Sequence, residues 1–185
     1  RLDRDTSGCI IVARNNHAHA HIAAQFAART VSKAYLAIVT GTPEKDRDII
    51  NKPIGMHPRQ REKMAVRADH STSRDAESFY EVLDRFEGHS LLRIKPKTGR
   101  THQVRVHLSF IGHPVLCDTM YGSLSSVRGR DIRPGLQETD DSVILARQAL
   151  HAASITFSHP VTEKPLSIEA AFPSDLQAVL DLLRG

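Results

Sequence analysis

Short runs of β-favouring residues, each closed by a turn signal, constrain the fold of this chain more than any other feature. Residues 32–40 (SKAYLAIVT) end at Gly41, and residues 76–86 and 90–95 are separated by a turn around Gly88. Runs of this length between turn residues are typical of strands, and a glycine turn between two of them predicts an antiparallel hairpin. The middle of the chain therefore favours an antiparallel sheet.

Strands outnumber helices along the rest of the chain. Further β-favouring runs cover residues 8–14, 155–157 and 166–171. Helical spacing of apolar residues predicts helices that begin at Asn16, cover residues 101–111 and begin at Ser174. The polar residues 123–142 predict a loop. Because strands and helices do not alternate in a regular βαβ order, we expect an α+β fold with a mixed, mostly antiparallel sheet flanked by helices and loops.

Length and composition indicate one globular domain. The 185 residues are 40% hydrophobic and 25% charged, and chains of roughly 100 to 200 residues commonly form a single core. No apolar run approaches the roughly 20 residues of a membrane helix. Charged residues also occupy the start of the chain, where a signal peptide would be apolar. We therefore expect a cytoplasmic protein without a membrane partner and, for want of an apolar surplus, a monomer.

Basic residues are unevenly distributed, which favours a polyanionic partner. The pI is about 9.3, although the formal net charge is only +4. Residues 93–105 contain no acid and five bases, which are Arg93, Lys95, Lys97, Arg100 and Arg105. A second group consists of Arg59, Arg61, Lys63 and Arg67. Such clusters fit phosphate contacts, but for the second group a solvated basic face is an equally good interpretation.

Two segments carry side chains that are suited to chemistry. The first, RLDRDTSG, combines Asp3 and Asp5 with two arginines and three turn-forming residues. Taken alone, it is better explained as a charged loop in which Asp5 forms a turn. The second, KTGRTHQVRVHL, places Arg100 and Arg105 at a predicted junction between a loop and a helix. Either arginine can pair with a carboxylate or a phosphate, and an arginine beside a carboxylate favours its ionised form.

Metal and disulfide sites are not expected. His17, His19 and His21 lie close in sequence, and His17 and His21 would share one helical face. However, no acid or cysteine nearby completes a ligand set. Cys9 and Cys117 have no paired spacing, and we interpret both as structural.

Five segments together resemble one family of RNA-modifying enzymes. They are RLDRDTSG at 1–8, KAYLAIVTG at 33–41, TGRTHQVRVHL at 98–108, GHPVLCDTMYG at 112–122 and RQALHAASITFSHP at 147–160. In this order they resemble the RluA-like family, the A type of ribosomal large-subunit pseudouridine synthases. The resemblance implies the pseudouridine synthase fold with a central RNA-binding cleft. Residues 1–185 would then be a single catalytic domain that lacks its N-terminal portion, because the family's histidine before RLD and its upstream lysine-proline motif precede Arg1. Cys117 stands where glycine is usual in the family.

The resemblance also implies roles for individual residues. It makes Asp3 the catalytic carboxylate, Tyr35 the aromatic residue that stacks on the target base, and Arg105 the partner of Asp3. The residues that it places in contact with RNA are Arg1, Arg4, Lys33, Arg100 and His102. For His102 a structural role is an equal alternative, and for Tyr35 a place in the core of a strand is a weaker one.

The implied reaction suits an ionised carboxylate. Pseudouridine formation breaks the bond between ribose and uracil, rotates the base and rejoins it through carbon. A carboxylate can serve as nucleophile, as electrostatic stabiliser or as base on the ribose, and the sequence leaves these open. The isomerisation is redox-neutral, so no cofactor is expected, and the partner is ribosomal or transfer RNA. The alternative function is a catalytically inactive RNA-binding module of the same fold, against which the presence of Asp3, Tyr35 and Arg105 argues.

Overall fold

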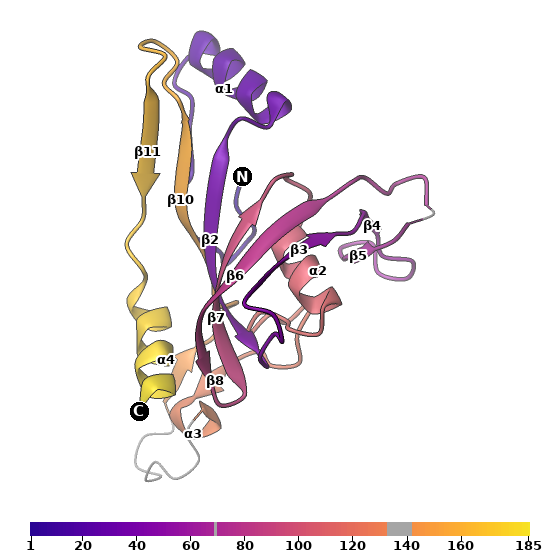
Figure 1. The fold of residues 1–185 in the computed structure, drawn as a ribbon, viewed down its shortest axis with the longest axis vertical. Coiled ribbons are helices and arrows are strands. Elements are labelled where there is room, and N and C mark those ends of the chain that lie inside the picture. Colours follow the sequence, from indigo (N-terminus) through magenta and orange to yellow (C-terminus); the bar gives the residue numbers. More distant parts are fainter. Residues whose placement is uncertain (69, 133–141) are drawn as a thin grey trace.

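A central sheet dominates the computed structural model, which describes residues 1–68, 70–132 and 142–185 (Figure 1). Over these residues seven strands form the sheet, in the order β1-β10-β2-β7-β6-β3, and β11 pairs with β10 beside β1. The strands are β1 (Ser7–Gly8), β2 (Ser32–Thr40), β3 (Arg47–Asn51), β6 (Glu77–Phe86), β7 (His89–Pro96), β10 (Leu150–Ser158) and β11 (Pro165–Glu169). Among the strands of this sheet in the described residues, only β1 and β10 pair in parallel. The expected mixed, mostly antiparallel sheet is thus confirmed.

The hairpin of β6 and β7 is the part of the sheet that the sequence predicts best. Phe86 pairs with His89 across the turn, and Gly88 has a φ of 70°, a conformation that costs glycine little because it lacks a Cβ. The predicted strand over residues 32–40 is β2, which lies between β7 and β10. Its residues Ile38 and Val39 are fully buried.

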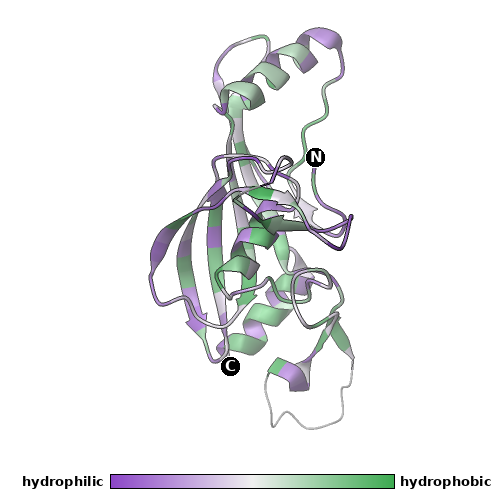
Figure 2. Ribbon diagram, turned by 90° about the vertical axis from the view of Figure 1, so that its right-hand side faces the viewer, coloured by the Kyte–Doolittle hydropathy of each residue, from purple (hydrophilic) through white to green (hydrophobic). Residues whose placement is uncertain are grey.

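Two helices cover one face of the sheet. They are α2 (Gln103–Phe110) and α4 (Ser174–Arg184), and both contribute to one core with the sheet. Leu108 of α2 and Leu176 of α4 are fully buried, and each such side chain stabilises the fold by about 1.5–3 kcal/mol. Figure 2 shows the two helices on the same side of the sheet. The helices predicted over 101–111 and from Ser174 are confirmed.

Helix α1 (Asn16–Ala28) stands away from this core (Figure 2). The side chain of Asn15, one residue before the predicted start at Asn16, accepts the backbone N–H of Ala18 and caps the helix. Arg29 ends the helix in a left-handed conformation, with a φ of 59°. Ile22 packs only on a small separate cluster around Ile155, so α1 is held by few apolar contacts.

Smaller elements lie around the sheet. The hairpin of β4 (Ile54–Met56) and β5 (Met64–Val66) extends sideways (Figure 1). Strands β8 (Val127–Arg128) and β9 (Val143–Leu145) form another pair, and α3 (Gly129–Ile132) follows β8. Because β8 and α3 occur there, the prediction of a loop over residues 123–142 is wrong for 127–132; residues 133–141 lie outside the described part.

The prediction of a strand over residues 8–14 is also wrong beyond Gly8, where β1 ends. Strand β1 pairs with β10 only at His151 and Ala152. From Ser154 onward the same edge of β10 is occupied by β11. Residues 9–14 therefore have no strand edge to pair with, although their composition favours β structure. No helix in the described part of the chain is long and apolar enough to cross a membrane.

Candidate active site

Asp3 lies in a tight loop that ends at β1. The backbone N–H of Thr6 donates to the Asp3 carbonyl at 3.1 Å, and Asp5 has a φ of 66°, so it forms the turn that the sequence suggests. Gly8 ends the loop with a φ of 118°, and a Cβ there would lie 2.2 Å from the Ala152 carbonyl oxygen. Only glycine lets the loop approach β10 this closely.

Side chains from residues 147–151 hold this loop from behind. The Gln148 amide donates to the Arg4 carbonyl at 3.0 Å and to the Thr6 hydroxyl. Arg147 donates to the Asp5 carbonyl at 3.3 Å. Gln148 is itself buried, so its contacts are shielded from water. The position of Asp3 is therefore set by a segment that is far away in sequence.

His151 adds a further contact to the same loop. Its Nε2 lies 3.2 Å from the Ala170 carbonyl oxygen and its Nδ1 lies 3.0 Å from the Ser7 hydroxyl. Since a carbonyl can only accept, Nε2 donates to Ala170, and the Ser7 hydroxyl lies within hydrogen-bond distance of Nδ1. The buried ring thus links β1 to the residues that follow β11.

Arg105 links two carboxylates beneath the loop. Its Nη1 lies 3.2 Å from Asp3 Oδ2, while Nε and Nη2 lie 2.7 and 2.8 Å from the two oxygens of Asp118. The side chains of Arg105 and Asp118 are 6% and 0% exposed, against 20% for Asp3. Asp118 thus fixes the guanidinium through a two-bond contact. Asp3 Oδ1 has no hydrogen-bond partner among the described residues.

Cys117, the residue before Asp118, lies in a turn whose backbone conformation suits the glycine that is usual in the resembled family. Cys117 has a φ of 58°, which is a conformation that favours glycine, and it stands where the resembled family has glycine. Its side chain is buried, and burial raises the pKa of the thiol to about 11. Asp118 Oδ1 also accepts the N–H groups of Met120 and Tyr121, at 3.0 and 3.1 Å. The turn therefore holds the carboxylate that orients Arg105.

Tyr35 and Asp3 line one cavity of about 300 Å³, here called the Asp3 cavity. Tyr35 lies on β2, opposite Ala152 of β10. Burial, and secondarily the charge of Asp3, raise the pKa of its phenol, so the ring stays neutral near pH 7. The half-buried ring also borders an adjoining, mostly apolar cavity of about 390 Å³ between α1 and β10. A neutral aromatic ring beside a carboxylate can stack on a base while the carboxylate meets the sugar.

His102 lines the Asp3 cavity from the start of α2. It has a φ of 55°, and its Nδ1 lies 2.9 Å from the Tyr121 hydroxyl. The two rings meet edge to face, with centroids 5.7 Å apart. Burial lowers the pKa of His102 more than the nearby charge of Asp3 raises it. Tyr121 also accepts the Met64 N–H at 2.9 Å, so His102 connects the cavity to the β4–β5 hairpin.

The structure brings most of the sequence-predicted residues together. Arg1, Lys33, Arg100 and His102 all line the Asp3 cavity with Asp3 and Tyr35, and Arg105 lies behind Asp3. Arg4 is the exception: its side chain is 94% exposed and pairs loosely with Asp5 at 3.8 Å.

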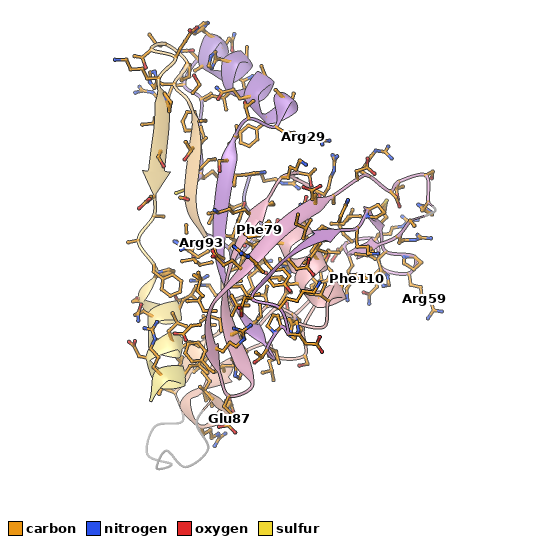
Figure 3. The ribbon with its side chains drawn as sticks, in the orientation of Figure 1. Arg29, Arg59, Phe79, Glu87, Arg93 and Phe110 are labelled. Atoms are coloured by element: carbon orange, nitrogen blue, oxygen red, sulfur yellow. The ribbon has the colours of Figure 1, made fainter. Side chains whose placement is uncertain are left out.

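The basic groups do not form one continuous surface. Arg105 is buried, Arg93 pairs with Glu81 at 3.0 Å and Lys97 pairs with Glu77 at 3.0 Å. The second group lies on the β4–β5 hairpin and its flanks, and Figure 3 shows Arg59 at the outer end of this region.

The histidines of α1 have ordinary partners. His17 Nε2 lies 3.2 Å from the Pro160 carbonyl oxygen and His21 Nδ1 lies 2.9 Å from the Gln25 amide. Across the described residues, no group of three histidine, cysteine, aspartate or glutamate side chains could hold a metal ion.

Sequence reasoning did not single out Asp118, Tyr121 and Gln148. All three lie in segments that carry the family resemblance, GHPVLCDTMYG and RQALHAASITFSHP. An acid that follows a turn residue, and an amide among apolar residues, are weak signals by themselves. Only the fold shows that they contact Arg105, His102 and the Asp3 loop.

Comparisons with known proteins point to one family. A model of the RNA pseudouridylate synthase family matches residues 1–110. The whole chain is 41% identical to ribosomal large subunit pseudouridine synthase D of Nitrosomonas europaea, of which it covers 50%. It is 34% identical to the chloroplastic RNA pseudouridine synthase 2 of Arabidopsis thaliana, of which it covers 45%.

Solved structures show the same fold. Human RNA pseudouridylate synthase domain containing 1 is 31% identical, with a TM-score of 0.74 over 97% of this chain and 71% of that one. Human RNA pseudouridylate synthase domain containing 4 is 25% identical, with a TM-score of 0.77 over 100% and 74%.

The fold thus defines a domain like those of the pseudouridine synthases, and Asp3 lines its candidate active-site cavity. The chain belongs to the RNA pseudouridylate synthase family. It spans about half the length of the curated relatives that it matches.

Proposed function

We propose that this chain isomerises uridine to pseudouridine in structured RNA and that Asp3 is the catalytic carboxylate. One observation carries the proposal: Asp3 lines a cavity with Tyr35, is ion-paired with Arg105, and keeps one oxygen without a protein partner among the described residues. A carboxylate placed in this way can reach a ribose that enters the cavity. Family membership supports the same reaction.

The proposed roles follow from the contacts. Arg105 orients Asp3 and places a positive charge beside it, because Asp118 holds the guanidinium by two bonds. Tyr35 is the surface on which the uracil stacks once it has left its own stack, a step that costs a few kcal/mol. The phenol's raised pKa makes Tyr35 a poor base near pH 7, which leaves Asp3 for the chemistry at the sugar. The protein supplies every group in this scheme, without a cofactor.

Positive side chains around the cavity suit an RNA substrate. Arg1, Lys33, Arg100 and His102 border it, and we propose that they contact the RNA. Arg4 lies outside the cavity, and its exposed side chain would contact only RNA phosphates that lie outside the cavity. The names of several curated relatives refer to the large ribosomal subunit, which favours ribosomal RNA over transfer RNA as the substrate here. A single catalytic domain over residues 1–185, a monomer and a cytoplasmic location complete the proposal.

The test uses RNA that contains no pseudouridine. The parent chain and Asp3→Ala are incubated with large-subunit ribosomal RNA transcribed in vitro, and pseudouridine is mapped at nucleotide resolution. The proposal expects product at defined uridines from the parent and none from Asp3→Ala. Equal product from both variants would remove Asp3 from its role. RNA binding without product from the parent would favour the inactive RNA-binding module.

A further inference from the structure

A second pocket adjoins the Asp3 cavity and has a different character. It has a volume of about 280 Å³ and is bordered by four basic residues, Arg29, Lys33, Lys97 and Arg100. It shares Lys33, Arg100 and Gly99 with the Asp3 cavity, so the two lie side by side. We call it the basic pocket. Among the residues that the structure describes, no carboxylate borders it.

The four bases are only partly neutralised by the protein. Lys97 pairs with Glu77 at 3.0 Å. Lys33 and Arg100 donate to backbone carbonyls, those of Thr98 at 3.1 Å and Asp75 at 2.9 Å. Among the described residues, no carboxylate lies within 4.0 Å of a charged nitrogen of Arg29, Lys33 or Arg100. The pocket therefore keeps a positive charge that an anion would offset.

The ammonium group of Lys33 indicates what kind of anion would suit the pocket. It is half-buried, and burial lowers the pKa of its ammonium group. One of its three donors is directed to Thr98, which leaves two for a ligand. An acceptor with several negative oxygens would both satisfy these donors and offset the cost of burying the charge.

Arg29 is an unusual residue for its backbone position. It follows the last residue of α1 with a φ of 59°, where glycine is the residue that a helix end favours. A side chain in this conformation is strained, and such positions often coincide with functional sites. Figure 3 shows Arg29 just beyond the end of α1, with its side chain directed away from the helix. A ligand contact would account for an arginine at this position.

We propose that the basic pocket binds one phosphate of the RNA backbone next to the uridine in the Asp3 cavity, with Arg29 and Lys97 as its outer contacts. The assignment of the neighbouring nucleotide rests on the proposed function, whereas the phosphate contact itself does not. Arginine and lysine around an open pocket match a phosphate diester, which carries one charge and two exposed oxygens. The phosphate would fix the backbone while the base turns towards Tyr35.

The test measures how RNA binding depends on salt. Kd is measured between 50 mM and 300 mM KCl, as assay conditions, for a labelled RNA hairpin with uridines in its loop. The proteins are the parent, Arg29→Gln, Lys97→Gln, the double variant and Arg47→Gln, a control on the exposed start of β3. The proposal expects the double variant to bind about tenfold more weakly at low salt. The slope of log Kd against log salt should become smaller by about 0.7 to 0.9, the value for one lost phosphate contact.

A second variant separates the phosphate contact from folding. Arg29→Gly should unfold at the same or a higher urea concentration than the parent, because glycine accepts the left-handed conformation, and it should still bind RNA more weakly. Arg29→Lys should recover part of the affinity.

The outcomes distinguish this proposal from the proposed function. An unchanged slope in the double variant, equal to that of Arg47→Gln, would overturn the phosphate site whether or not the parent forms pseudouridine. A reduced slope in a parent chain that forms no pseudouridine would support the site and reject the reaction.

Discussion

Arg105 contacts two carboxylates, and the two contacts have different strengths. Asp118 binds it through two short bonds in a fully buried setting, whereas Asp3 receives one longer bond of 3.2 Å at the edge of the cavity. The guanidinium also lies over the Tyr121 ring, 5.0 Å from its centroid. Asp118 therefore sets the geometry, and Asp3 receives a fixed positive partner that leaves one of its oxygens for the substrate.

Asp118→Asn should be one of the most destabilising single changes at the site. It leaves the buried guanidinium of Arg105 without its main charge partner, and breaking a buried pair costs about 3–5 kcal/mol. Urea unfolding measures this loss. Asp175→Asn is a matched control, because Asp175 also holds an arginine, Arg147, by two bonds but is 36% exposed. The control should lose about 1 kcal/mol. Equal losses in both variants would contradict the special role of Asp118.

His107 makes stability depend on pH. The ring is fully buried, with Nδ1 2.9 Å from the Ser78 hydroxyl and Nε2 2.9 Å from the Lys52 carbonyl oxygen. Burial lowers its pKa below the ordinary 6.5. The unfolded chain therefore takes up a proton as pH falls through 6.5, while the folded chain does not. His102, whose pKa is also lowered, acts in the same direction.

Stability should fall from pH 7.5 to pH 5.5 by up to about 1.4 kcal/mol per pH unit for each such histidine. Urea midpoints at the two pH values should differ less in His107→Gln than in the parent, because the variant lacks this proton uptake. Identical pH dependence in both proteins would show that His107 is not held neutral.

At the scale of elements, the segment before β10 and the loop before β1 act as one unit. Residues 147–151 supply three side chains to the Asp3 loop, and β1 continues the contact by pairing with β10. The loop is short, and these contacts with β10 and the residues before it hold it in one conformation. The conformation of the Asp3 loop is therefore fixed by β10, a strand that lies inside the sheet.

Gln148→Leu should impair catalysis more than RNA binding. The leucine preserves volume but leaves the Arg4 carbonyl and the Thr6 hydroxyl without their donor, which costs about 1–3 kcal/mol of stability. A small displacement of Asp3 should lower kcat between about tenfold and 100-fold, while KM for RNA changes little because the cavity's basic residues remain. Gln177→Leu on α4, whose amide bonds only Asp181, should leave kcat unchanged. A rise in KM with constant kcat would assign Gln148 to substrate binding instead.

Elements with a clear local pattern could be predicted from the sequence. Strand β2 and the β6–β7 hairpin have β-favouring runs and a glycine turn, and α1 has apolar residues at helical spacing after Asn16. The failures depend on long-range competition. Residues 9–14 have the composition of a strand, but β11 occupies the edge of β10 that they would need. No local signal in residues 9–14 reveals that competitor.

At the scale of the whole molecule, the sheet joins segments that are far apart in sequence. Asp3 and Arg105 are separated by 102 positions, and Gln148 lies 144 positions from Arg4. The family resemblance suggested Asp3, Tyr35 and Arg105; in the structure Asp3 and Tyr35 line one cavity, and Arg105 is ion-paired with Asp3 behind it. Residue types alone favoured a charged loop at Asp3, since nothing local distinguishes it from Asp5. Asp118 could not be predicted because its importance comes from its contact with Arg105.

The most direct measurement compares Asp3→Asn with Asp5→Asn in a single-turnover assay on unmodified large-subunit ribosomal RNA. Both changes remove one negative charge from the same loop with almost no change in volume. Asp3 lines the cavity, whereas Asp5 forms the exposed turn. Pseudouridine should form at the parent's sites with Asp5→Asn, at a rate close to that of the parent, and should be undetectable with Asp3→Asn. The reverse result, or equal loss in both variants, would contradict the account.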